Sequence, residues 1–140
     1  MTTFLVLGAL VAVATALGLI WKSGQGKLRA SATHSVIPAE FLTPGTTTLL
    51  QFTTEMCGPC AALKPQLQKI ALYRSDITHR EVDAVDHIDL ASKLNIRSTP
   101  TTLIVSDTGE IRGRINGVAP ARVFLDAVDG TPTATQENTQ

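Results

Sequence analysis

Cysteine is nearly absent from this 140-residue chain, which has two, and aromatic residues make up only 4% of it. Two cysteines are too few for a disulfide-rich scaffold, so the fold must be stabilised by burial of apolar side chains. The formal net charge is zero, and no run of five like charges occurs. We therefore expect no basic surface and no nucleic-acid partner.

Metal-ligating residues are also sparse. A structural zinc site usually needs four ligands, and the cysteines supply two. The three histidines, His34, His79 and His87, are scattered singly, so each is expected to be an ordinary surface or partly buried residue. Covalent haem would need a histidine directly after the second cysteine, where the chain has Ala61. We expect no bound metal and no separate cofactor.

A long apolar segment is present at the N-terminus, where residues 4–21 contain no charge. As a helix this segment would be about 27 Å long, close to the thickness of the hydrocarbon core of a bilayer. Trp21 and Lys22 would then supply an interfacial aromatic and a basic flank. The pattern predicts one transmembrane helix over residues 1–21.

Two alternatives remain for this segment, a buried core helix and a cleaved signal peptide. The sequences AVA and ATA within residues 12–16 have the small-x-small form of a cleavage site. The N-terminal MTT, however, carries no basic residue, and the nearby Lys and Arg all follow the apolar run. By the positive-inside rule we expect a single-pass cell-membrane protein with its domain in the cytoplasm, the extracytoplasmic side being the alternative.

The rest of the chain divides into three segments by composition. Residues 22–35 are mostly small and polar, which is typical of a flexible linker. Residues 131–140, TPTATQENTQ, offer almost nothing to bury and should be disordered. Residues 36–130 should fold as one α/β domain.

Apolar periodicity predicts alternating strands and helices in that domain. The expected strands are residues 46–52, 76–83, 101–106 and 110–115, and the expected helices are residues 57–73, 88–94 and one that starts at Pro120. Asp86 is a candidate N-cap for the second helix. Arg112 and Arg114 alternate with apolar residues, which suggests an outer strand. The order predicts a mixed sheet with helices on both faces.

The two cysteines lie in the motif CGPC, between an expected strand and an expected helix. Cys57 would lie at the helix N-terminus, where free N–H groups and the helix dipole stabilise a thiolate. Gly58 and Pro59 permit a turn that brings the Cys60 sulfur within bonding distance. The spacing favours a redox pair in which Cys57 attacks a disulfide and Cys60 resolves the mixed disulfide. A static staple is the alternative, although so short a loop contributes little stability.

Four landmarks in order give the chain a resemblance to the thioredoxin family. They are the motif CGPC, a proline at position 65, the segment IRSTPT over residues 96–101 and the segment NGVAP over residues 116–120. The resemblance runs from Thr47 to about Val128. It implies a thioredoxin fold, preceded here by one transmembrane helix, and dithiol–disulfide exchange at Cys57 and Cys60.

The resemblance also implies a substrate surface around the cysteines. Pro100 would be cis and would pack beside them. The backbone of Thr99 would pair with an extended substrate segment, which gives weak sequence selectivity. Met56 and Gly117 would complete this surface.

Several residues depart from the pattern of the family. Met56 and Thr53 replace customary tryptophans, and Gln51 replaces a buried acid that assists proton transfer. An amide cannot exchange a proton at physiological pH. We therefore expect slower proton removal from Cys60, or a route through water or Glu55.

Together these features predict a membrane-tethered reductase of protein disulfides. Its partners would be protein disulfides, an electron-donating reductase and the membrane through residues 4–21. The Cys57–Cys60 disulfide would serve in place of a cofactor. The alternatives are a thioredoxin-fold binding or adaptor module and an extracytoplasmic disulfide oxidase or isomerase.

Overall fold

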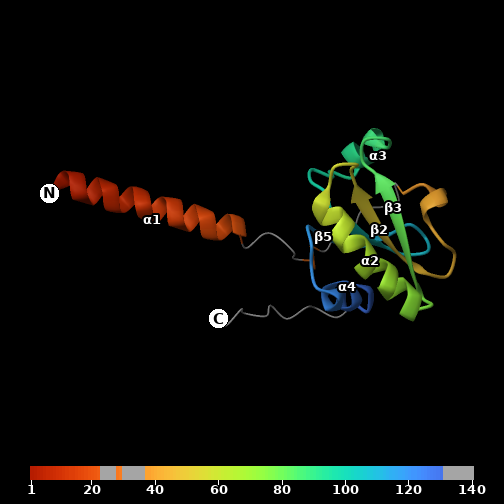
Figure 1. Ribbon diagram of the computed structural model, residues 1–140. Coiled ribbons are helices and arrows are strands. Elements are labelled where there is room, and N and C mark those ends of the chain that lie inside the picture. The colour runs from red at the N-terminus through yellow and green to blue at the C-terminus, as the bar shows by residue number, and fades with distance from the viewer. Residues whose placement is uncertain (23–27, 30–36, 131–140) are drawn as a thin grey trace.

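The computed structural model describes residues 1–22, 28–29 and 37–130, and Figure 1 shows how their elements are arranged. In chain order these elements are the helix α1 (Thr2–Lys22), the strand β1 (Leu28–Arg29), the 3-10 helix η1 (Ala39–Phe41), β2 (Thr47–Thr53), α2 (Gly58–Tyr73), β3 (Ile77–Asp83), α3 (Ile88–Lys93), β4 (Thr101–Val105), β5 (Ile111–Asn116) and α4 (Ala121–Val128).

A mixed five-stranded sheet forms the centre of the domain, in the order β1-β5-β4-β2-β3. β2 and β3 are parallel, and the other neighbouring pairs are antiparallel. β4 is buried along its whole length, and only the two end residues of β2 are partly exposed. Strands covered on both faces read as nearly continuous apolar runs, which explains their clear signal in the sequence.

Helices cover both faces of the sheet, as the element order predicted. α2 and α4 pack on one face, where Leu63, Leu67 and Phe124 share a buried cluster with Leu49 of β2. α3 packs on the other face, where Leu90 joins a second cluster of buried residues. In Figure 1, α2 crosses in front of β2 and β3, so its N-terminus lies at the end of the sheet where β2 finishes.

An ion-pair cluster joins the ends of α2 and α4. The guanidinium of Arg74 donates to Asp76 and to Asp129, with the shortest contacts at 2.7 and 2.8 Å. These hydrogen bonds lower the pKa of both carboxyl groups below the usual value of 3.8. Because all three groups are exposed to solvent, the cluster orients the helix ends more than it stabilises them.

Three local predictions differ from the structure. The N-cap of α3 is His87 rather than Asp86, because the Asp83 carboxylate already accepts from the N–H groups of Val85 and Asp86 and forms the turn itself. β5 is not the outermost strand, since β1 pairs with its free edge. β1 lies within residues 22–35, which were expected to form a linker, and Lys22 belongs to α1. The other linker residues and the predicted disordered tail lie outside the described residues.

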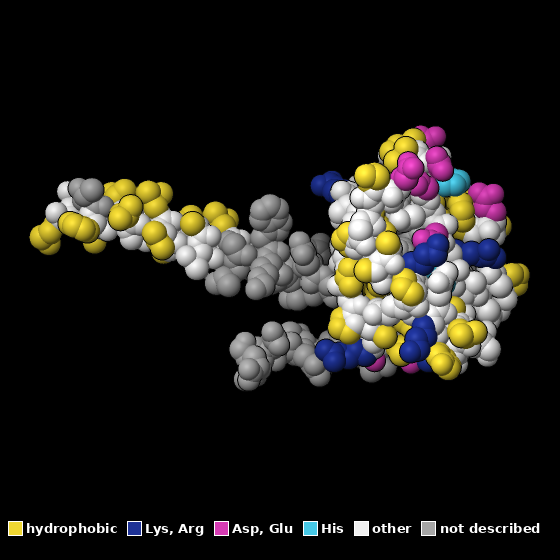
Figure 2. All heavy atoms as spheres, viewed as in Figure 1, with side chains coloured by type: hydrophobic (Ala, Val, Ile, Leu, Met, Phe, Trp, Pro, Cys, Tyr) yellow, Lys and Arg dark blue, Asp and Glu magenta, His cyan; other side chains and the backbone are white. Residues whose placement is uncertain are grey.

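The N-terminal segment forms the 21-residue helix α1. Its large apolar side chains from Phe4 to Leu17 are exposed, and the helix extends away from the sheet (Figures 1 and 2). In the described part of the chain, no helix combines the length and apolarity needed to cross a membrane. The expected transmembrane span over residues 4–21 is therefore not confirmed by the structure.

Candidate redox site

Cys57 is the N-cap of α2 and lies directly before its first turn. Pro59 falls within that turn, where a missing backbone N–H costs no helical hydrogen bond. The N–H of Cys60 donates to Sγ of Cys57 at 3.2 Å. A sulfur in this position meets a backbone donor and the positive end of the helix dipole, and both favour its thiolate.

The two cysteines form a disulfide, with their Cα atoms 5.2 Å apart. Their exposure differs, because Cys60 is only 2% exposed while Cys57 is partly open to solvent. Gly58 and Pro59, which form the turn between them, are exposed. A bulky disulfide substrate can therefore approach Cys57 more readily than Cys60. This asymmetry suits Cys57 for attack and Cys60 for resolution.

The Thr99–Pro100 peptide bond is cis and lies directly before β4. The hydroxyl groups of Thr99 and Thr54 are 3.3 Å apart. The carbonyl of Thr54 in turn accepts from the N–H of Cys57 at 3.2 Å. Two hydrogen bonds thus connect the cis-proline loop to the cap of α2, so Thr99 lies at the same end of the domain as the cysteines.

The turn before α4 is fixed to the same loop. Gly117 has a φ of +81°, a conformation that favours glycine, and its N–H donates to the carbonyl of Pro100 at 2.8 Å. Met56, next to Cys57, is 95% exposed. The structure therefore joins Gly117 and the cis-proline loop by a hydrogen bond, connects that loop through Thr54 to the cap of α2, and leaves Met56 exposed. Their role in binding a substrate stays a prediction.

A buried polar pair that the sequence did not reveal lies behind the second cysteine. The completely buried Gln51 donates from Nε2 to the carbonyl of Cys60 at 3.2 Å. Its Oε1 lies 3.0 Å from Nε2 of His79 on β3. A lone histidine has no local motif, so no motif marked His79. The one available signal was strand alternation, which places Leu49 and Gln51 on one face of β2, where His79 pairs with Leu49.

The surroundings of His79 lower its pKa. Burial is the main cause, the charge of Lys64 adds to it, and the charge of Glu81 opposes it. Lys64 and Glu81 also form an ion pair at 2.6 Å. His79 is therefore neutral near pH 7 and serves its neighbours as a hydrogen-bonding group rather than as a charge.

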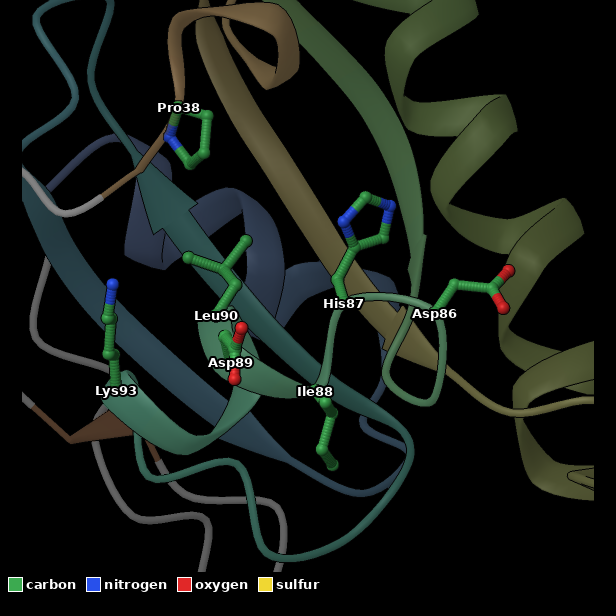
Figure 3. A pocket seen from close by; sticks show the side chains of 7 residues that line it. All are labelled: Pro38, Asp86, His87, Ile88, Asp89, Leu90 and Lys93. Atoms are coloured by element: carbon green, nitrogen blue, oxygen red, sulfur yellow. The ribbon is translucent and has the colours of Figure 1, made fainter.

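A pocket of about 270 Å³ lies around the start of α3, and Figure 3 shows the side chains that line it. It is lined by Pro38, Asp86, His87, Ile88, Asp89, Leu90 and Lys93. Neither cysteine nor the cis proline is among them. Within residues 1–22, 28–29 and 37–130, no cluster of three or more His, Cys, Asp or Glu residues has the arrangement of a metal site.

Comparison with protein families matches residues 34–130 to the family model described as Thioredoxin. The chain belongs to the thioredoxin family. With its bonded CGPC cysteines, it is a thioredoxin-like thiol–disulfide oxidoreductase.

Relatives with similar sequences are thioredoxins from distant organisms. Thioredoxin of Mycoplasma genitalium is 35% identical over 78 residues, which cover 56% of this chain and 76% of that protein. Thioredoxin C-2 of Corynebacterium nephridii is 32% identical over 100 residues, 71% of this chain and 92% of that protein. The match to mouse mitochondrial thioredoxin spans 44% of that protein, at 31% identity and 52% coverage of this chain.

Solved structures show the same fold. Spinach chloroplast thioredoxin f superposes with a TM-score of 0.55 at 27% identity, covering 62% of this chain and 77% of its own. Oxidised mitochondrial thioredoxin 3 of Saccharomyces cerevisiae gives a TM-score of 0.56 at 21% identity, covering 65% of this chain and 83% of its own. The likeness to the yeast protein concerns the fold alone.

Replacing His79 by Gln should remove a pH-dependent part of the stability. Because burial lowers the pKa of His79 below 6.5, the unfolded chain takes up a proton more readily than the folded protein. The free energy of unfolding should therefore be at its full value above pH 6.5 and should fall as the pH drops through the lowered pKa. Urea unfolding at a series of pH values measures this, and the variant should show a smaller fall.

Asp76 and Asp129 do not account for a fall in stability between neutral pH and pH 5. Their pKa values lie below 3.8, so their effect on the free energy of unfolding appears in more acidic solution. Equal slopes for the wild-type protein and the variant between neutral pH and pH 5 would contradict the assignment of this effect to His79.

Proposed function

We propose that this protein reduces disulfide bonds in other proteins. The main support is the position of Cys57, whose partly exposed sulfur caps α2 while its partner Cys60 is buried. Gly and Pro between the cysteines resemble reducing more than oxidising members of the family. The relatives reported above are themselves named thioredoxins, which is consistent with this direction.

The reaction proceeds through a mixed disulfide. The Cys57 thiolate attacks one sulfur of the substrate, a Cys57–substrate bond forms, and the other substrate sulfur leaves as a thiolate and takes up a proton. Cys60 loses its proton and attacks Sγ of Cys57. The Cys57–Cys60 bond forms, and the second substrate sulfur leaves with the electron pair. Two electrons have then moved from the protein to the substrate, and no separate cofactor takes part.

The surface formed by Thr99, Pro100 and Met56 beside the cysteines binds the substrate. An extended segment pairs with the backbone of Thr99, next to the cis Pro100, and rests against the exposed side chain of Met56. Because backbone pairing recognises shape more than sequence, the protein accepts several protein substrates. An electron-donating reductase then returns the Cys57–Cys60 disulfide to the dithiol.

The helix α1 attaches the protein to the cell membrane, with the redox domain on the cytoplasmic side. Residues 4–21 carry no charge, and the nearby basic residues follow them. The large apolar side chains of the helix are exposed, from Phe4 to Leu17. In Figure 2 they appear along the helix, apart from the domain. A membrane is an environment in which such a surface is buried.

Replacing Cys60 by Ser should trap the protein on its substrates. The variant can still attack through Cys57 but cannot resolve, so mixed disulfides should accumulate on non-reducing gels and disappear when a reductant is added. The Cys57→Ser, Cys60→Ser variant is the matched control and should trap nothing. A protein that only binds its partners would retain them in both variants, and that result would contradict the reductase proposal.

Membrane attachment predicts that the full-length protein stays with membranes after alkaline carbonate extraction. A variant lacking residues 1–22 should be found in the soluble fraction, since it loses the apolar helix. In intact cells, a membrane-impermeant thiol reagent should leave reduced Cys57 unlabelled and should label it after lysis. Release of the full-length protein by carbonate would refute attachment, and labelling in intact cells would refute the cytoplasmic orientation.

A further inference from the structure

Two hydrogen bonds fix the side chain of Gln51 behind the resolving cysteine. Its Nε2 donates to the carbonyl oxygen of Cys60, and its Oε1 contacts Nε2 of His79. Gln51 lies on the interior strand β2 and is completely buried. His79 lies on the neighbouring strand β3. The amide therefore links the first turn of α2 to the next strand of the sheet.

The chemistry of these groups fixes the direction of each hydrogen bond. A backbone carbonyl can only accept, so the amide must turn its NH₂ group towards Cys60. The amide oxygen can only accept as well, so Nε2 of His79 must carry a hydrogen. Neutral His79 is then the Nε2–H tautomer, with Nδ1 unprotonated.

The neighbour of Gln51 on the other side of β2 does not replace His79 as a partner. Thr102 of β4 lies directly opposite Gln51 in the sheet. The hydroxyl of Thr102 is buried, and none of the described residues forms a hydrogen bond with it. Without His79, Oε1 would lose its recorded hydrogen bond and the amide would be held through Nε2 alone.

We infer that His79 is a positioning residue for the resolving step, because its Nε2–H holds Gln51 with the donor end of the amide towards Cys60. The donor end of the amide bonds to the Cys60 backbone carbonyl, so the amide acts on the Cys60 thiolate through the direction of its dipole. A positive end turned towards Cys60 favours the thiolate that must form before Cys60 attacks Cys57, whereas a negative end turned towards it would disfavour that thiolate. The recorded hydrogen bond of His79 goes to Gln51 and not to Cys60, so His79 acts by positioning the amide and is not assigned as the base for the Cys60 proton.

The charged groups around His79 are compatible with this role. Lys64 on α2 and Glu81 on β3 both act on its ring, and they are paired with each other. Their charges act on the pKa of His79 in opposite directions, Glu81 raising it and Lys64 lowering it. Hydrogen-bond donation, which needs no change of protonation, is therefore what His79 contributes near neutral pH.

A two-step thiol reaction separates the attacking step from the resolving step. The reduced full-length protein is mixed with excess 5,5′-dithiobis(2-nitrobenzoate), and the coloured thiolate is followed by stopped flow. The first release of coloured thiolate reports attack by Cys57 on the reagent. The second release reports attack by Cys60 on the mixed disulfide at Cys57, and its rate does not depend on the reagent concentration. The Cys60→Ser variant gives the first release alone and so identifies the two phases.

His79→Leu removes the donor, and His79→Gln keeps one. From the usual net value of one neutral hydrogen bond, the second release should slow about three- to tenfold in His79→Leu. In His79→Gln it should return to within about twofold of the wild-type rate, and the first release should change less than about twofold in both variants. An unchanged second release in His79→Leu, equal slowing of both releases, or no recovery in His79→Gln would overturn the inference.

The tautomer of His79 gives a second test that needs no substitution. Nitrogen NMR of the folded wild-type protein above pH 7 should show the ring proton on Nε2, and a proton on Nδ1 would overturn the inference. The inference rests on dithiol exchange by Cys57 and Cys60, and the two can fail separately. Absence of both releases from the wild-type protein would refute exchange itself, whereas two normal releases that do not depend on His79 would refute only the role of His79.

Discussion

The function depends on one contact, in which the N–H of Cys60 donates to the sulfur of Cys57 at the start of α2. The interior strand β2 leads the chain to this point, and the buried cluster that contains Leu63, Leu67 and Ile70 holds α2 against the sheet. A backbone donor and the helix dipole together can lower the pKa of a thiol. The rest of the domain makes one cysteine accessible, keeps the other buried and brings the cis-proline loop beside them.

The buried polar groups behind the cysteine pair differ from the pattern of the family. An amide, Gln51, occupies the buried position behind Cys60, and a histidine from β3 contacts it. The amide cannot exchange a proton at physiological pH, and the ring nitrogen of His79 that faces it already carries one. The buried pair therefore contributes the orientation of its dipoles rather than the proton transfer that a buried carboxylate would assist.

Much of this was predictable from the sequence because the signals are local. The fully buried β4 and the helical spacing of Leu63, Leu67 and Ile70 in α2 carry their periodicity in the chain itself. The position of the CGPC motif at a helix N-terminus was likewise predictable, because the motif lies between an apolar strand and a segment with helical spacing. In contrast, the contact between Gln51 and His79 depends on the register of two strands, which side-chain pattern alone does not specify. The two-residue strand β1 was missed because its stability comes from the edge of β5 rather than from its own residues.

Titration of the two thiols in the reduced protein tests the central claim most directly. Each cysteine can be followed separately, by NMR or by the pH dependence of alkylation in single-cysteine variants. The account predicts that Cys57 ionises at a lower pH than both Cys60 and free cysteine. If the two thiols titrate together, at the pH of cysteine in water, then the position of Cys57 at the start of α2 does not activate it and the account is contradicted.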